Sequence, residues 1–168
     1  KAGSMASAVM VLAIVGAPVG GIITDRWRKS NIRARLLFPT ITSVLAAIFL
    51  LIALWLTTGT MQYVFFLLMG VTVTAFVPAA AAVTQDVIHA GMRAMSYAVA
   101  VVVQNLLGAS TAPLVIGRLY DLYDIKTAMA LLPFMLLLGA ILFYAGSRYY
   151  VRDLDRTAKI QLEAEKQE

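Results

Sequence analysis

Residues Leu36–Gln85, LLFPTITSVLAAIFLLIALWLTTGTMQYVFFLLMGVTVTAFVPAAAAVTQ, contain no charged side chain over 50 consecutive positions. A helix needs about 20 mostly apolar residues to cross the hydrocarbon core of a bilayer. The stretch is therefore long enough for two crossings joined by a turn. The segment Thr57-Thr58-Gly59-Thr60 separates its two apolar halves, and a glycine among hydroxyl residues is typical of a turn.

Three further charge-free runs lie at residues 2–24, 94–117 and 127–147. With the first stretch they predict five membrane-spanning helices, at about residues 5–23, 36–57, 62–85, 95–117 and 127–147. These runs are far longer than the strands of a membrane β-barrel, which need about 10 residues and alternate in polarity. The predicted fold class is an all-α polytopic membrane helix bundle over residues 1–150, followed by a polar tail over 151–168.

The composition supports a membrane protein. Hydrophobic residues make up 61% of the chain and charged residues 14%, against about 25% charged residues in a typical soluble domain. This excludes intrinsic disorder, which requires low hydrophobicity and high net charge. The chain has no cysteine, which excludes a disulfide framework and a thiolate metal site.

Lysine and arginine are distributed unequally between the two sides of the predicted bundle. The loops after the first and third spans, together with the tail, hold 11 of the 14 basic residues, and the other side holds 3. By the positive-inside rule, the sequence predicts a cytoplasmic C-terminus. We expect an integral membrane protein of the bacterial inner membrane. The net charge of +5 thus reports topology, with attraction to membrane lipids as a by-product, and predicts no nucleic-acid partner.

The five spans differ in their side chains. Those at 36–57 and 127–147 are rich in bulky aliphatics, which suits a surface facing lipid. The first span carries Gly16 and Gly20, a spacing that lets helix backbones approach closely. The third and fourth spans carry polar, glycine and aromatic residues, and carboxamides at membrane depth need partners or a cavity.

We therefore predict substrate-binding residues on the third and fourth spans. They are Thr72, Phe76, Tyr97, Gln104, Asn105, Gly108 and Thr111. Tyr97, Gln104, Gly108 and Thr111 share one face of an ideal helix. Two alternatives remain open: Gln104 and Asn105 could form hydrogen bonds between helices, and Phe76 could serve packing alone.

The segment Gly21–Lys29, GIITDRWRK, resembles the inner-loop signature of the major facilitator superfamily, Gly-x-x-x-Asp-Arg-x-Gly-Arg-Arg/Lys. The matching residues are Gly21, Asp25, Arg26 and Lys29; Arg28 and Ser30 depart from the pattern. The segment Arg93–Asp121 is similar to the eleventh transmembrane helix of this superfamily, and it faintly resembles the spinster-like branch. The resemblance implies that the five spans are transmembrane helices 8–12 in the C-terminal half of a transporter.

The resemblance also implies a mechanism. The protein would be a secondary active transporter that moves a small solute by alternating access, with protons or sodium as the coupling ion and no cofactor. Asp25 would close the inner side by pairing with the opposite half. For Asp86 and His89, at the inner end of the third span, structure at the membrane interface and proton coupling both remain open. The chain starts almost inside the first span and without methionine, so we expect earlier sequence, including the N-terminal half.

The sequence offers little support for two other classes of function. A channel-like or non-transporting scaffold subunit lacks support, because no ring of charges or selectivity filter is recognisable. A membrane enzyme is disfavoured more strongly. The single histidine, His89, and the absence of acidic residues within a span leave no intramembrane protease constellation.

Overall fold

The computed structural model describes residues 2–88, 90–123 and 125–165. Within these ranges the chain is helical and forms no strand, which confirms the all-α prediction. The elements are α1 (Ala2–Arg28), α2 (Ala34–Leu51), η1 (Ile52–Leu56), α3 (Gly59–Ala75), α4 (Val77–Asp86), η2 (Ala90–Met92), α5 (Arg93–Val103), η3 (Gln104–Ala109), α6 (Thr111–Leu122) and α7 (Ile125–Glu165).

Several of these elements join end to end into long rods. Four described stretches are long and apolar enough to cross a membrane: Ala34–Leu56, Gly59–Asp86, Arg93–Leu122 and Ala128–Thr157. To within one residue at two of the ends, they contain four of the five predicted spans. The remaining span lies within α1, a helix of 27 residues.

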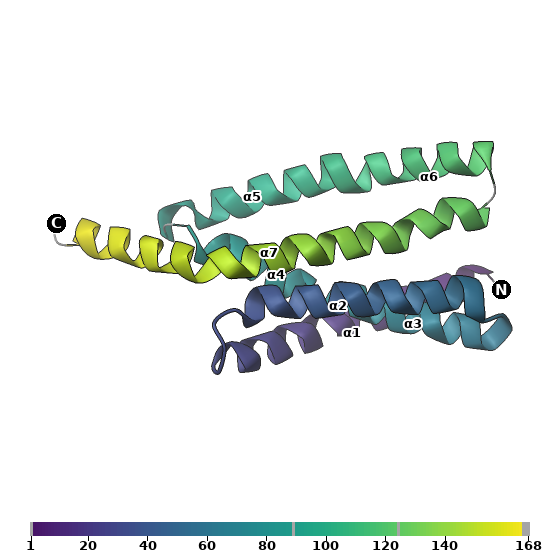
Figure 1. The fold of residues 1–168 in the computed structure, drawn as a ribbon, viewed down its shortest axis with the longest axis horizontal. Helices are drawn as coiled ribbons and strands as arrows, with labels where there is room; N and C mark the ends of the chain where they lie inside the picture. Colours follow the sequence, from purple (N-terminus) through teal and green to yellow (C-terminus); the bar gives the residue numbers. More distant parts are fainter. Residues whose placement is uncertain (1, 89, 124, 166–168) are drawn as a thin grey trace.

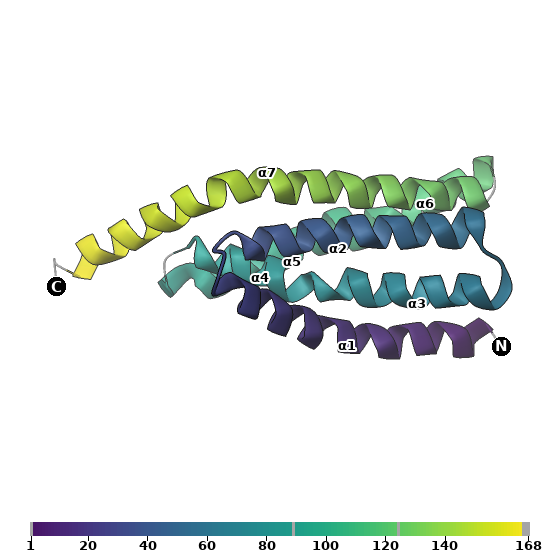
Figure 2. The ribbon, with the colours of Figure 1, turned by 60° about the horizontal axis from the view of Figure 1, so that its bottom comes forward.

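The rods lie side by side and roughly parallel to one another. Figure 2 shows α7, α2, α3 and α1 in that order across the molecule, and successive members of this series pack together. The rod of α5 and α6 runs alongside α7, on the side away from α2 (Figure 1). It touches the remainder through α4 near one end and α7 near the other.

The ends of the rods agree with the predicted topology. The α1–α2 loop, the α4–α5 connection and the C-terminal segment lie at one end of the molecule (Figure 1). The α2–α3 and α6–α7 turns lie at the other end, with the N-terminus. The strongly basic segments of the sequence therefore gather at a single end, here called the inner end.

The turn between α2 and α3 forms where the sequence predicts it. Thr57 and Thr58 have extended backbones, and Gly59 has φ +66°, a left-handed conformation that favours glycine. Gln62 Nε2 donates a hydrogen bond to the Ala53 carbonyl oxygen at 2.9 Å. This bond links the start of α3 to η1 across the turn.

The glycine pair in α1 lies against α3. A Cβ atom added to Gly20 would lie 2.7 Å from Ala75 Cα and closer still to the Ala75 carbonyl oxygen. One added to Gly16 would lie 3.2 Å from the Val71 carbonyl carbon. Carbon atoms in contact are usually about 3.5–4.0 Å apart. The predicted close approach at this glycine pair is therefore confirmed.

Of the four stretches that are long and apolar enough to cross a membrane, the one that contains α2 is the most buried, although its aliphatic composition predicts a lipid-facing helix. Its small side chains, such as Ala46 and Ala47, are fully buried between α3 and α7. Its bulky side chains Ile41, Leu45 and Ile48 are 40–46% exposed along the opposite face. The prediction is correct for that one face only, because small residues placed among the bulky ones face the neighbouring helices.

Candidate functional site

A cavity of about 270 Å³ opens between α4 and α5. It forms where the third span is interrupted: α3 ends at Ala75, and α4 begins at Val77 with a proline in its first turn. Proline has no N–H to continue the helical hydrogen bonds, so the third span breaks there into α3 and α4. The lining residues are Phe76, Val77, Ala80, Ala81, Thr84, Tyr97, Ala100, Val101 and Gln104.

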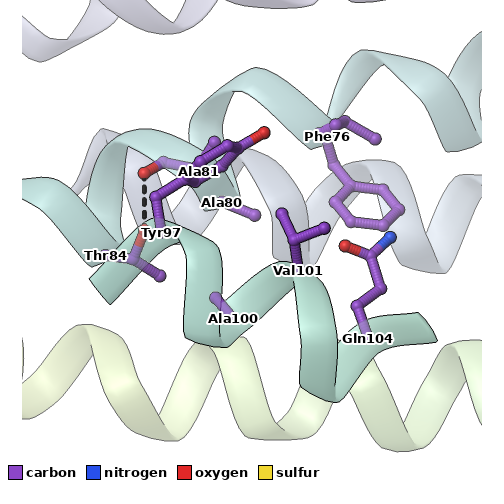
Figure 3. Close-up of a pocket in the computed structure, with 9 residues that line it drawn as sticks. Phe76, Ala80, Ala81, Thr84, Tyr97, Ala100, Val101 and Gln104 are labelled. Atoms are coloured by element: carbon purple, nitrogen blue, oxygen red, sulfur yellow. Dashed lines mark hydrogen bonds between the residues drawn. The ribbon is translucent and has the colours of Figure 1, made fainter. Parts of the chain in front are cut away.

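The walls of this cavity are mostly apolar. Figure 3 shows the Gln104 carboxamide pointing toward the ring of Phe76, and the Tyr97 ring lying near Ala81. The Thr84 hydroxyl donates to the Ala81 carbonyl oxygen at 2.8 Å, so its hydrogen is already used. Among the described lining residues, Gln104 and Tyr97 thus offer polar groups to a ligand, and none carries a full charge.

Three of the seven predicted substrate-binding residues meet in this cavity: Phe76, Tyr97 and Gln104. The other four lie outside it. The Thr72 hydroxyl donates to the Leu68 carbonyl oxygen at 2.6 Å, and Asn105 Nδ2 donates to the Val101 carbonyl oxygen at 2.8 Å. Thr111 donates to the Leu107 carbonyl oxygen, and a Cβ on Gly108 would meet no atom within 4 Å.

A π-helical segment explains why the residues predicted to share one helix face do not all line the cavity. In η3, Ser110 N–H donates to the Asn105 carbonyl oxygen, five residues back, at 2.9 Å. One inserted residue rotates everything after it by about 100° relative to an ideal α-helix. Gly108 and Thr111 therefore leave the face that carries Tyr97 and Gln104. The shared-face argument assumed an unbroken α-helix.

A second polar site lies at the inner end, centred on Asp86. Its Oδ2 accepts a hydrogen bond from Tyr150 Oη at 2.5 Å and another from Arg35 Nη1, and it lies 3.4 Å from Arg28 Nη2. Arg35 Nη2 also lies 3.7 Å from Asp25 Oδ1. We call these five residues the inner charge cluster. It joins α1, α2, α4 and α7.

Burial separates the members of this cluster. The side chains of Arg35 and Asp86 are only 14% and 18% exposed, whereas that of Asp25 is 69% exposed. Asp86 is therefore the hub of the cluster, and Asp25 is a peripheral member. Proton coupling by Asp86 stays a prediction, and His89 lies outside the described residues.

The predicted gating residues lie at the same end of the molecule. Gly21 faces α4, where an added Cβ would lie 3.6 Å from Pro78 Cβ. Arg26 and Lys29 are exposed. Gating by these residues stays a prediction.

Sequence reasoning missed Arg35 and Tyr150. A signal for Arg35 was present, because Arg35 and Asp86 directly flank the 50-residue charge-free stretch. Two antiparallel helices joined by a tight turn place their far ends side by side. The two charges that bound the stretch should therefore meet. Nothing in the sequence pattern marks Tyr150 as their partner.

Comparison with known proteins adds the family. The family model described as Major Facilitator Superfamily matches residues 1–166, almost the whole chain. No curated protein and no solved structure gave a significant match. The family match agrees with the helical architecture and with the signature-like segment Gly21–Lys29 at the C-terminal end of α1. The chain therefore belongs to the Major Facilitator Superfamily, a superfamily of membrane transporters.

Proposed function

We propose that the chain supplies helices 8–12 of a secondary active transporter that moves a small solute by alternating access. In such transporters, one half rocks against the other around a site near the middle of the membrane. The observation that carries the proposal is the cavity between α4 and α5, where Phe76, Tyr97 and Gln104 come together. We assign the substrate to this cavity. A spinster-like relationship belongs to the same proposal.

The N-terminal half is the proposed partner of the α5–α6 rod. Within the described part of the chain, α5, η3 and α6 contain no buried residue. Bulky side chains such as Leu106, Leu107 and Leu114 are 61–71% exposed. A rod with this much uncovered surface can accommodate further helices, while α7 and the outer face of α2 remain for lipid. Protons or sodium are the proposed coupling ions.

The inner end is the proposed cytoplasmic side, and residues 151–168 are the proposed cytoplasmic tail in a bacterial inner membrane. The unequal distribution of basic residues supports this orientation. Helix α7 continues unbroken to Glu165, so the tail begins as an extension of the last span. The Thr157 hydroxyl lies within hydrogen-bonding distance of two carbonyl oxygens, that of Asp153 in its own helix at 3.0 Å and that of Val87 at 3.1 Å. The start of the tail therefore contacts the residue that follows α4.

Replacing Gln104 with leucine should weaken substrate binding without reducing protein abundance. The change removes one hydrogen-bonding group from an apolar wall. A lost hydrogen bond of about 1–1.5 kcal/mol predicts a KM raised roughly tenfold. Saturable uptake by proteoliposomes of the complete transporter, normalised to protein amount, measures this effect.

Gln85→Leu is the matched control, because it makes the same chemical change at an exposed position outside the cavity. It should leave KM unchanged. If Gln104→Leu lowers abundance while uptake per molecule stays normal, Gln104 is a packing residue. Counterflow separates the classes of function: a transporter accelerates exchange when substrate is present on the far side, and a channel does not.

Replacing Asp25 with asparagine should slow transport while leaving membrane insertion intact. We propose that Asp25 interacts with a helix end of the opposite half in one conformer only, since its carboxylate is largely exposed in this chain. A carboxylate at a positive helix end contributes about 0.3–1 kcal/mol, which predicts a two- to fivefold change in rate. Uptake rates in reconstituted vesicles test this.

Asp121→Asn serves as the control for Asp25, because it removes an exposed carboxylate at the opposite end of the bundle. Equal transport rates for Asp25→Asn and the unmodified protein would show that Asp25 has no gating role. Asp25 would then be a charge that marks the end of a span.

A further inference from the structure

Another cavity, lined mainly by polar side chains, lies at the inner end, between the start of α2 and the middle of α7. Its volume is about 510 Å³. It is lined by Asn31, Arg33, Leu37, Tyr144, Ser147 and Arg148. These residues share none of the lining of the α4–α5 cavity and none of the inner charge cluster. The proposed transport mechanism makes no use of them.

The two arginines of this cavity are not neutralised by carboxylates. Across the described ranges, neither Arg33 nor Arg148 forms a salt bridge, whereas Arg28 and Arg35 pair with Asp86. No acidic residue lines the cavity. Both arginine side chains are exposed and can reach a ligand. The cavity therefore carries a net positive charge that favours an anion.

Neighbouring groups hold these arginines in place. The Arg148 guanidinium lies over the Tyr144 ring, 5.5 Å from the ring centre, an arrangement that stabilises a cation. Arg33 precedes the first residue of α2, and its backbone N–H donates to Asn31 Oδ1 at 3.0 Å, which fixes the position of its main chain at the cavity. Because Oδ1 of Asn31 already accepts this bond, Asn31 can offer its amide nitrogen to a ligand as a hydrogen-bond donor.

The surroundings of this cavity are apolar on the membrane side. Leu37 lies one turn into α2, and Ile41 follows on the same face, 46% exposed. On α7, Ile141 lies one turn before Tyr144 and is 63% exposed. A hydrocarbon chain can therefore lie along these exposed aliphatic side chains, next to the charged groups on the side toward the middle of the bundle.

We propose that this cavity binds the phosphate of an anionic phospholipid, with Arg33 and Arg148 as its cationic ligands. Arginine matches phosphate in geometry as well as in charge, because its guanidinium can donate two parallel hydrogen bonds. Basic pockets between membrane helices on the cytoplasmic side are suited to anionic headgroups. The acyl chains lie along Leu37, Ile41 and Ile141.

The test titrates phosphatidylglycerol into the complete, delipidated protein in detergent and counts bound lipid by native mass spectrometry. The double variant Arg33→Gln/Arg148→Gln should bind this lipid roughly 30-fold more weakly, since each cation near a headgroup contributes about 1 kcal/mol. The double variant Arg93→Gln/Arg118→Gln removes the same charge from exposed positions outside the cavity and should bind as the unmodified protein does. Equal binding by all three proteins would overturn the proposal.

Two further ligands identify the source of the phosphate. Phosphatidylcholine and soluble glycerol phosphate should both bind more weakly than phosphatidylglycerol. If glycerol phosphate binds as tightly as the lipid, the site takes a soluble anion and the lipid assignment is overturned. If the double variant does not fold, Arg33→Gln alone, which leaves the Arg148–Tyr144 contact intact, should weaken binding about fivefold.

Discussion

Replacing Gly20 with alanine should lower the free energy of unfolding by about 3 kcal/mol, because an added methyl group overpacks the α1–α3 contact. The new Cβ would lie 2.7 Å from Ala75 Cα and closer to the Ala75 carbonyl oxygen. Both atoms belong to the backbone, so no side chain can turn aside to make room. The helices must separate, and the neighbouring contact at Gly16 would be lost with them.

The sign of this effect is informative, because helix propensity acts in the opposite direction. Alanine in the interior of a helix is favoured over glycine by about 1 kcal/mol. The adjacent variant Gly21→Ala gains the same propensity, and its Cβ would meet only Pro78 at 3.6 Å, an ordinary contact. Gly21→Ala should therefore be neutral or slightly stabilising.

Thermal unfolding of the complete protein in detergent, with folded yield as a second readout, compares the two glycine variants. A lower midpoint for Gly20→Ala and an unchanged or higher midpoint for Gly21→Ala are expected. Equal midpoints would mean that α1 and α3 do not pack as closely as described. The comparison is well controlled, because the two variants differ by one position on the same helix.

Replacing Asp86 with asparagine should cost about 3 kcal/mol of stability, because it leaves Arg35 charged and largely buried without a full counter-charge. Asparagine keeps the shape of the side chain and can still accept hydrogen bonds from Tyr150 and Arg35. The loss is therefore electrostatic. Asp25 can replace little of the lost charge, since it is 69% exposed and 3.7 Å from Arg35 Nη2.

A double-mutant cycle isolates this charge interaction. Arg35→Gln/Asp86→Asn removes both charges, so it should recover much of the stability lost by Asp86→Asn alone. Thermal unfolding of the two single variants and the double variant measures the coupling. Additive losses would show that Arg35 and Asp86 stabilise the inner end independently of each other, contrary to the observed geometry.

Much of the architecture follows from local patterns in the sequence. Charge-free runs of 20 or more residues have few alternatives to a helix, because hydrocarbon offers no partner to an exposed backbone group. The turn at Gly59 and a close helix–helix approach at Gly20 could both be predicted, since each depends on a residue type with a special geometric property, but the identity of the helix that Gly20 meets could not. The neighbours of α2 could not be predicted, because composition does not indicate which face of a helix meets another helix.

The candidate site could be predicted in part for a related reason. Phe76, Tyr97 and Gln104 were recognisable as polar and aromatic side chains at membrane depth. The rotation of the helix at η3 could not be recognised in the sequence, because a π-helical segment arises from packing and has no residue signature of its own. Arg35 and Asp86 are 51 residues apart, and their contact follows only once the hairpin between them is known.

The unbroken length of α7 matters for structure determination. Its 41 residues correspond to about 60 Å of continuous helix, and its C-terminal part extends beyond the bundle (Figure 2). Small membrane proteins give electron microscopists little to align, since the detergent belt hides most of their features. A helical scaffold fused in register after Glu165 would continue the same helix as the last span and would provide the missing fiducial mark.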